Sequence, residues 1–566
     1  MHLVARLHHS KSLVRCTFIS QLKVAVRSLC SGSRNWKQPD GYDSGVKVRN
    51  SLCHEDKDTL VPLILPHGKV ARWYACGPTV YDTSHIGHAS YCVRFDIIRR
   101  ILENFFDIKV IQVMGITNID DKIIEQAAKT GEDHSTLANR HEAQFLSDMN
   151  DLQVLPASHY ARVTDYVPSI IQFISRVIRN GYAYATPSGS VYFDLMAFGA
   201  DRYGKLRYQR LEEEGPQEIQ NTEKRHPRDF ALWKAAKKGE PWWLSPWGRG
   251  RPGWHMECSA MSSAIFGENL DIHVGGIDLA FPHHTNEIAQ CEGCFETNQW
   301  TNYFLHSGFL YLKRDSEKMS KSLGNVISIP QFLSSYSSNH FRTLCLFMRY
   351  SSNIEYSDEA LSKAVTTCRQ ITSFLGDCEA YVRGQITGGA VEEAKIFESV
   401  NDASMRIRQA FADDFDTPRA MTVIMDLIRS TNVQLQPSKE ASCCSARYPG
   451  AIAYVSSFIS STLSSLGFDF KGREASDSVS AAKLSSTLDT LVSFRSDVRN
   501  WAFSTDNDFS DKKAETTKEK KKRLQEERAD LLTACDKVRD SLTKQGIQLK
   551  DRGQISTWEF TDVRPE

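Results

Sequence analysis

The order of apolar and polar positions predicts alternating strands and helices between residues 70 and 120. Residues 70–77 (VARWYACG) form a short apolar run, which is typical of a buried strand, and 93–105 (VRFDIIRRILENF) has the spacing of an amphipathic helix. A second apolar run covers 107–120 (DIKVIQVMGITNID). Strand, helix and strand in this order are typical of a parallel, doubly wound sheet. We therefore expect an α/β fold with a Rossmann-like sheet.

The pattern changes between residues 131 and 245, which we interpret as an insertion. Two amphipathic helices are predicted at 134–152 and 167–181, followed by a hairpin at 183–195 and a Gly/Trp-rich loop. Strand-like apolar runs resume at 253–261 (GWHMECSAM), 269–281 (NLDIHVGGIDLAF) and 302–312 (NYFLHSGFLYL). The sheet domain is thus expected to be split into 60–130 and 246–345.

Beyond residue 346 the pattern becomes helical. Helical periodicity covers 361–382 and 405–431, and the Ser-rich stretch 455–486 indicates surface loops and poor helix. The mixed-charge run 511–528 is typical of a solvated helix, and 545–560 could form a short hairpin. We expect a mostly α-helical C-terminal domain after the sheet.

Composition restricts the class of protein. The 566 residues are 41% hydrophobic and 24% charged, as in soluble globular proteins, and no run of 18 apolar residues predicts a membrane span. Lys+Arg and Asp+Glu are both 69, so any site for a polyanion must be a local patch. Fourteen irregularly spaced cysteines suggest thiols or metal ligands, not a disulfide framework.

Residues 1–39 differ from the rest. They are rich in Arg, Lys and Ser and contain no acidic residue before Asp40, which is typical of an organelle transit peptide. A mitochondrial address is favoured because residues 22–29 alternate apolar and basic positions. A chloroplast address and a basic RNA-binding arm are the alternatives.

One stretch, FPHHTNEIAQCEGC (281–294), is crowded with possible metal ligands. A soft metal could bind any of His283, His284, Glu287, Cys291 and Cys294, and a tetrahedral zinc needs only four ligands.

Two further motifs suit a polyphosphate. HIGH (85–88) lies where a predicted strand meets a helix, and unpaired N–H groups at a helix N-terminus favour anions. KMSKS (318–322) places two lysines three residues apart in a polar loop. Each motif alone is weak, but both in this order on one doubly wound sheet are specific.

Together these stretches resemble the class I aminoacyl-tRNA synthetases, specifically the cysteinyl-tRNA synthetases and among them the mitochondrial ones. The resemblance extends over residues 76 to about 558 and rests on CGPTVYDTSHIGH, TNIDDKII, RPGWHMECSAM, DIHVGGIDLAFPHHTNEIAQ, KMSKSLGN, FADDFDTPRAM and CDKVRDSLTKQGIQLKD…STW. It implies ATP-dependent ligation of L-cysteine to tRNA(Cys) through a cysteinyl-adenylate, in the mitochondrial matrix.

The resemblance also implies one zinc ion that takes the substrate thiolate as a ligand. Its protein ligands would be Cys76, Cys258, His283 and Glu287. A helix would put His283 and Glu287, at i and i+4, on one face. His284 would be rotated away from them, either as a core histidine or as one that supports the ligands from outside. Cys291 and Cys294 are then expected to be buried, small apolar side chains.

Other site residues follow from the same resemblance. It implies that Gly77, Thr117, Trp254 and His283 surround cysteine, although a core aromatic is the alternative for Trp254. His85, His88, Gly276, Asp278 and Lys321 would bind ATP, and His85, His88, Lys318 and Lys321 would stabilise phosphoryl charge. Mg²⁺ would accompany ATP.

The domain roles and partners complete the prediction. Residues 346–400 would contact the tRNA stem and 401–566 would bind tRNA, including the anticodon, with the chain a monomer rather than a homodimer. A secondary persulfide synthase activity would need pyridoxal phosphate; Lys122 is present for it, but Glu125 stands where the family has lysine. Alternatives are a cysteine ligase acting on a small amine and a catalytically dead RNA-binding paralogue.

Overall fold

The computed structural model describes residues 36–53, 59–199, 202–206, 223–312, 326–386, 391–436, 447–470, 478–504, 517–552 and 555–560. The chain divides into two compact units. The first comprises Met1–Phe332, Cys345–Ser357 and Gln409–Pro418, and the second Leu333–Leu344, Asp358–Arg408 and Arg419–Glu566. Residues 1–35 of the predicted transit peptide and the KMSKS loop, including Lys318 and Lys321, lie outside the described residues.

The first unit contains a five-stranded parallel sheet with the strand order β12-β11-β3-β4-β5. Its strands in chain order are β3 (Val70–Thr79), β4 (Lys109–Thr117), β5 (His159–Arg162), β11 (Leu270–Gly276) and β12 (Thr301–Ser307). Counted along the chain this is the order 3-2-1-4-5 of a doubly wound fold, which confirms the predicted fold class. Since β5 belongs to this sheet, the sheet includes a strand from the predicted insertion.

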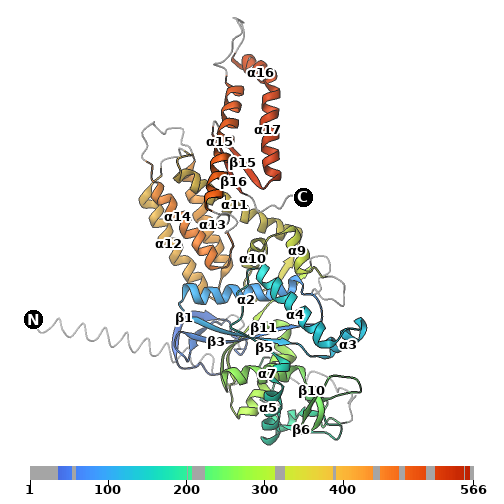
Figure 1. The fold of residues 1–566 in the computed structure, drawn as a ribbon. Helices are drawn as coiled ribbons and strands as arrows, with labels where there is room; N and C mark the ends of the chain where they lie inside the picture. The colour runs from blue at the N-terminus through green and yellow to red at the C-terminus, as the bar shows by residue number, and fades with distance from the viewer. Residues whose placement is uncertain are drawn as a thin grey trace, which may run out of the picture. The chain divides into compact units, whose positions relative to one another are not determined.

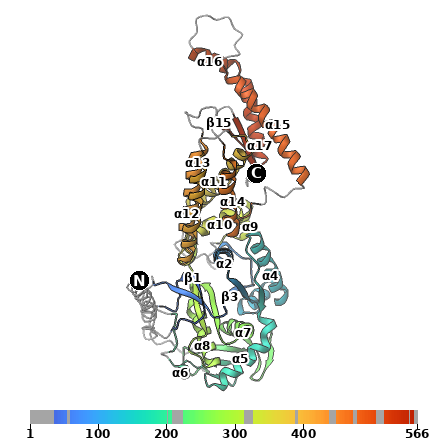
Figure 2. The same ribbon diagram turned by 90° about the vertical axis from the view of Figure 1, so that its left-hand side faces the viewer.

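Helices cover both faces of the parallel sheet, with α2 on one face and α7 on the other (Figures 1 and 2). The strand order reverses between β3 and β11, where doubly wound proteins bind ligands at the carboxyl ends of strands. The helical elements of this region are α2 (Ile86–Phe105), α3 (Asp121–Thr130), α4 (His134–Asp151), η1 (Val163–Tyr166), α5 (Val167–Arg179), α7 (Trp254–Phe266), η3 (Ile277–Leu279), η4 (Ala280–His284) and α8 (Thr285–Phe295).

The strand-like interpretation of GWHMECSAM is wrong, because these residues begin helix α7. Every residue from Met256 to Ser262 is buried, so the helix has no polar face to reveal its period. A short apolar run of this kind cannot be distinguished from a buried strand by periodicity alone.

A second, antiparallel sheet has the order β6-β7-β8-β10-β9. It lies in the inserted region except for β10, which follows the predicted end of the insertion at residue 245. The predicted hairpin is confirmed, since β6 and β7 pair antiparallel. The strands are β6 (Ala183–Ala185), β7 (Val191–Phe193), β8 (Phe230–Ala235), β9 (Trp243–Ser245) and β10 (Gly248–Pro252), with the short helix α6 (Leu195–Phe198).

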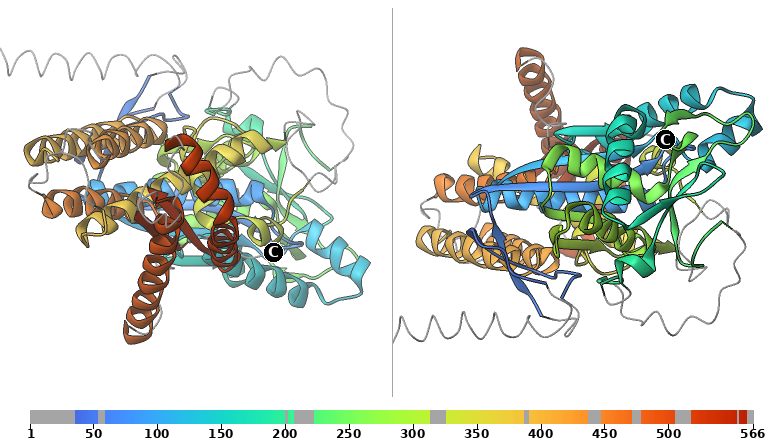
Figure 3. Two further views of the ribbon diagram at one scale, coloured as in Figure 1. Left: turned by 90° about the horizontal axis from the view of Figure 1, so that it is seen from above. Right: turned by 90° about the horizontal axis from the view of Figure 1, so that it is seen from below.

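Two small sheets complete the first unit. Strands β1 (Tyr42–Val48) and β2 (Val61–Leu65), dark blue in Figure 3, pair antiparallel and form a sheet of their own. Strands β13 (Leu310–Leu312) and β14 (Ile354–Tyr356) pair in parallel.

The second unit is helical, as predicted. Its elements are α10 (Ser338–Leu346), α11 (Asp358–Val382), α12 (Glu393–Ala412), α13 (Thr417–Leu435), α14 (Pro449–Ser465), α15 (Ser478–Phe503), α16 (Thr517–Glu527), α17 (Ala529–Lys544), β15 (Ile547–Arg552) and β16 (Ile555–Phe560), with α9 (Ile329–Ser335) and the ends of α10, α12 and α13 at the boundary with the first unit. The predicted C-terminal hairpin is confirmed by β15 and β16.

Two helical predictions need correction. The predicted helix 405–431 is broken between α12 and α13, where Asp414 and Phe415 adopt φ values of 54° and 53°. The Ser-rich stretch begins inside a regular helix, α14, whose buried face includes Val455 and Ile459, so it is not surface loop there. Among the described helices, none is long and apolar enough to cross a membrane.

Candidate metal centre and active site

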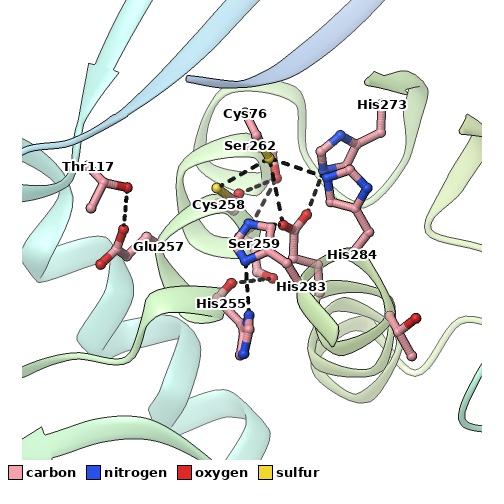
Figure 4. Close-up of polar contacts among 12 residues, drawn as sticks. Cys76, Thr117, His255, Glu257, Cys258, Ser259, Ser262, His273, His283 and His284 are labelled. Carbon is pink, nitrogen blue, oxygen red and sulfur yellow. Dashed lines mark hydrogen bonds and ion pairs between the residues drawn. The ribbon is translucent and has the colours of Figure 1, made fainter. Parts of the chain in front are cut away.

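Four donors from four elements meet beneath the carboxyl ends of β3 and β11. One ligand atom from each of Cys76, Cys258, His283 and Glu287 lies within 4.8 Å of the others, and all four residues are buried. Cys76 comes from β3, Cys258 from α7, and His283 and Glu287 from η4 and α8. Figure 4 shows the side chains of Cys76, Cys258 and His283 turned toward one another.

The donor set fits zinc. Two thiolates about 2.3 Å from one tetrahedral zinc ion lie about 3.8 Å apart, and the Sγ atoms of Cys76 and Cys258 are 3.8 Å apart. The Nδ1 atom of His283 lies 2.9 Å from Nδ1 of His255, so its Nε2 faces the cluster, 2.6 Å from Oε1 of Glu287. Sulfur, imidazole and carboxylate donors are all ordinary zinc ligands.

The charges in the cluster pair with one another. Burial alone would raise the pKa of Glu287, but the charges and hydrogen bonds of His283 and His273 lower it to about 2. A hydrogen bond from Cys76 lowers the pKa of Cys258 to about 6, against the effect of burial. Burial opposes the protonation of His283, yet Glu287 and Cys258 raise its pKa to about 10. A carboxylate and a thiolate are therefore available as ligands at neutral pH.

The expectation that His284 turns away from the cluster is wrong. Its Nε2 lies 3.4 Å from Sγ of Cys76, and Nε2 of His273 lies 2.5 Å from Oε2 of Glu287. Cys76, His273, His284 and Glu287 consequently form a second set of four donors within 4.8 Å of one another. Neighbouring residues of a helix point about 100° apart, which is why His284 was expected to turn away. Cys76 lies beside the start of α8, however, and the side chains of both His283 and His284 come close to it.

Cys291 and Cys294 lie elsewhere. Both are buried, with 0% and 1% of their surface exposed, and neither belongs to a four-donor set among the described residues. The Sγ atom of Cys291 faces the Ser263 hydroxyl at 3.8 Å. These contacts fit the predicted role of small apolar side chains.

The HIGH motif caps helix α2. His85 is the N-cap, its Nδ1 accepts the N–H of Gly87, and Nδ1 of His88 accepts the N–H of His85. In a neutral imidazole the other nitrogen then carries the proton, so both rings present Nε2–H donors. The rings stack with centroids 3.9 Å apart.

The chain that follows the KMSKS loop returns to the HIGH motif. Ser328 forms an isolated antiparallel bridge with His85, and the N–H of Ile86 donates to the carbonyl of Ile327 at 3.0 Å. Ile327 and Ser328, five and six residues after Ser322, therefore lie beside the N-terminus of α2.

Thr117 and Trp254 lie around the metal cluster. Thr117, the last residue of β4, donates its hydroxyl to Oε2 of the buried Glu257 at 2.8 Å. Trp254 opens α7, is 39% exposed, and its ring centroid lies 4.6 Å from that of His283. Its exposure argues against a core aromatic.

Two glycines let other parts of the protein come close to the backbone at the ends of β3 and β11. A Cβ at Gly77 would meet the carbonyl oxygen of Gly115 at 2.2 Å, so Gly77 lets β3 and β4 pack closely. A Cβ at Gly275 would meet the ring of His284 at 2.4 Å. Gly276 ends β11, and the exposed side chain of Asp278 lies just beyond the carboxyl end of this strand.

Sequence reasoning missed several residues of this site. His255, His273 and His306 surround the four donors, and Tyr74 and Glu257 lie beside them. A signal was available, because histidines inside otherwise apolar strands such as NLDIHVGG are unusual unless they have polar partners.

Comparison with known proteins identifies the family. Residues 64–366 match the model described as the tRNA synthetases class I (C) catalytic domain, and 406–471 match the DALR domain. The chain is 47% identical over 538 residues to "Probable cysteine--tRNA ligase, mitochondrial" of Xenopus tropicalis, covering 94% of this chain and 92% of the relative. It is 38% identical to "Cysteine--tRNA ligase" of Pyrococcus abyssi, covering 92% of this chain and all of the relative.

A solved structure gives the same fold. The methionyl-tRNA synthetase of Mycobacterium tuberculosis, bound by methionyl-adenylate, superposes with a TM-score of 0.55 at 15% identity, covering 71% of this chain and 93% of that one. At this identity the likeness concerns the fold alone. The catalytic-domain match, the DALR match and the relatives over nearly the whole chain together place this protein among the class I tRNA synthetases, in the cysteine--tRNA ligase family.

Proposed function

We propose that this chain forms cysteinyl-adenylate from L-cysteine and Mg-ATP and transfers cysteine to tRNA(Cys) in the mitochondrial matrix. The observation that carries the proposal is the buried cluster of Cys76, Cys258, His283 and Glu287 at the point where the strand order reverses. The mitochondrial names of two relatives, from Xenopus tropicalis and Dictyostelium discoideum, support the location.

Cysteine selection is assigned to the metal cluster. Cys76, Cys258, His283 and Glu287 would hold one zinc ion, and bound zinc would supply a soft Lewis acid that prefers a sulfur anion to a neutral hydroxyl. Shape alone separates cysteine from serine by only about 1–3 kcal/mol. Thr117, Trp254 and Gly77 would shape the rest of the amino-acid pocket.

The ATP site is assigned to the neighbouring edge of the sheet. Gly276 and Asp278 would contact the adenosine, and His85 and His88 would donate their Nε2–H groups to the phosphates. Lys318 and Lys321 of KMSKS would add positive charge, and Ser328, six residues after this motif, pairs with His85. The cysteine carboxylate attacks the α-phosphate of ATP and pyrophosphate leaves. A ribose hydroxyl of the 3′-terminal adenosine of the tRNA then attacks the acyl carbon, and AMP leaves.

The tRNA is assigned to the helical part of the chain, with 346–400 contacting the stem and 401–566 the anticodon region, in a monomeric enzyme. The DALR match within this part and the length of the relatives count against a ligase for small amines. The intact donor cluster counts against a dead paralogue. Persulfide synthesis with pyridoxal phosphate stays a prediction.

ATP–pyrophosphate exchange tests the proposal. The purified protein should exchange pyrophosphate with cysteine and at least about a hundredfold more slowly with serine. Cys258→Ala should lose both bound zinc and exchange, whereas Cys294→Ala, a matched change at a buried cysteine outside the cluster, should keep both. Equal exchange with cysteine and serine in the zinc-loaded protein would contradict the proposed selectivity.

A further inference from the structure

A chain of hydrogen bonds leads from the metal cluster to a residue before the parallel sheet. Sγ of Cys76 lies 3.4 Å from Nε2 of His284, Nδ1 of His284 lies 2.8 Å from Nε2 of His306, and Nδ1 of His306 lies 2.7 Å from Oγ of Ser51. His284 and His306 are 0% and 5% exposed. Ser51 is half-buried and follows β1.

The fold builds the space for this chain. Gly275 on β11 pairs in register with His306 on β12. Because Gly275 has no side chain, the ring of His284 lies over it, at a position where a Cβ would be 2.4 Å from the ring. The N–H of Ser51 donates to the carbonyl of Phe304 on β12, which fixes Ser51 beside His306.

As a metal ligand Cys76 would be a thiolate and would no longer donate its proton to Cys258. The distances then allow only one direction of hydrogen-bond donation toward Cys76. A thiolate only accepts, so Nε2 of His284 carries a proton and Nδ1 must accept in a neutral ring. His306 then donates from Nε2 and accepts at Nδ1, and the Ser51 hydroxyl donates to it. Burial lowers the pKa of His306 to about 3, which keeps its ring neutral.

We propose that Ser51, His306 and His284 form a directed hydrogen-bond chain that positions the Cys76 thiolate in the metal centre. The inference rests on the proposed metal centre at Cys76, Cys258, His283 and Glu287. Ser51 and His306 are positioning residues that touch neither metal nor substrate. Ligands of metal sites commonly depend on such outer hydrogen bonds, and the loss of one typically costs about 10–100-fold in metal affinity or activity.

The direction of these hydrogen bonds also indicates which of the two sets of four donors binds the metal. If His284 donates a proton from Nε2 to Cys76, that nitrogen cannot bind a metal at the same time. His273 and His284 are then outer hydrogen-bond partners of the ligands Glu287 and Cys76, and the protein binds one metal ion per chain. A second metal bound by His284 would require Nε2 to lose its proton.

Cobalt(II) substitution tests the inference, because its sulfur-to-metal charge-transfer band reports the electron density on the thiolates. In Ser51→Ala the hydrogen bond to Cys76 is weakened, so the band should move to longer wavelength and metal affinity should fall severalfold in competition with a chromophoric chelator. Gly275→Ala, which displaces His284, should lower affinity by about 10–100-fold. Ser51→Thr keeps the hydroxyl and should restore the wild-type band.

Ser175→Ala is the matched control. Ser175 is also half-buried, but its hydroxyl donates to the carbonyl of Ile171 within α5. It should bind cobalt like the wild type. An unchanged band and affinity in Ser51→Ala would overturn the inference while the metal centre stands. Two metal ions per wild-type chain would also overturn it, by making His284 a ligand. A wild-type protein that binds no metal would instead remove the proposed centre itself.

Discussion

The hydroxyl of Thr117, in the proposed amino-acid pocket, donates to a single carboxyl group. It donates its proton to Oε2 of Glu257 at 2.8 Å, in surroundings where both side chains are buried. Because the proton is used there, the lone pairs of the Thr117 oxygen can only accept. A positively charged ammonium group is the donor that such an oxygen would suit in the proposed pocket.

Replacement of Thr117 by Val removes this acceptor while keeping the shape of the side chain. A hydrogen bond to a charged group is worth about 1.5–3 kcal/mol, so KM for cysteine should rise roughly tenfold to a hundredfold. KM for ATP and the bound metal should stay unchanged, and Thr117→Ser should restore KM. ATP–pyrophosphate exchange measures both constants, and an unchanged KM for cysteine would refute the assigned contact.

For single residues, the sequence alone could predict contacts only between side chains a few positions apart. His283 and Glu287 share a helix spacing, so their meeting could be expected from the sequence. Cys76 and Cys258 lie 182 positions apart, and only the family resemblance connected them. Nothing local in the sequence connects Ser51 with His306, 255 positions away, because the register of β11 and β12 brings them together.

At the element scale, one buried arginine ties the last hairpin to helix α15. Arg495 donates to Asp551 on β15 at 2.7 and 3.1 Å and to the carbonyl of Cys535 on α17 at 2.9 Å. These contacts lie next to an apolar cluster of Leu488, Val492, Leu542, Ile547 and Leu549. The sequence predicted the hairpin from its turn and strand pattern, but not the arginine that holds it.

Protonation of Asp551 should make the second unit less stable in acid. Its hydrogen bond from Arg495 lowers its pKa to about 2, against the effect of burial, and the unfolded value is about 3.9. Since the folded pKa is the lower one, the stabilisation is present above about pH 4 and is lost as the pH falls toward 2. Asp551→Asn should lower the free energy of unfolding by about 1–3 kcal/mol at pH 7 and match the wild type near pH 2.

An exposed ion pair provides the control for Asp551. Arg523 and Glu527 on α16 lie 3.1 Å apart, and the Glu527 side chain is 56% exposed. Exposed helical pairs of this spacing contribute about 0.3–0.5 kcal/mol, so Glu527→Gln should change little. Thermal unfolding at pH 7 and near pH 2 measures the free energy of unfolding of both variants. An equal decrease in both would show that the Arg495–Asp551 pair stabilises the unit no more than an exposed pair does.

At the scale of the whole molecule, the parallel sheet could be predicted because strand, helix and strand follow one another within 50 residues. The end of the predicted transit segment is less certain from composition than the sheet is from its pattern. Trp36 falls within the predicted range 1–39, yet it is 6% exposed and donates from Nε1 to the carbonyl of Asn302 at 2.6 Å. Composition cannot detect a single aromatic residue that packs on a distant strand. Because Trp36 is part of the folded structure, we expect any transit peptide to be removed before this residue.

The division into two compact units predicts how metal removal affects stability. All four proposed ligands belong to the first unit, and a bound ligand stabilises only the unit that binds it. At a free zinc concentration a hundredfold above Kd the gain is about 2.7 kcal/mol. For a unit of about 350 residues that amounts to about 3–5 °C in Tm.

Differential scanning calorimetry with and without a chelator measures this effect. The chelator should shift one transition downward by that amount and leave the transition of the second unit in place, since multidomain chains commonly unfold in separate steps. Asp551→Asn should move only the transition that the chelator leaves unchanged, because Asp551 belongs to the second unit. If the chelator and Asp551→Asn shift the same single transition, the two units unfold together, and metal binding then stabilises the helical unit as well.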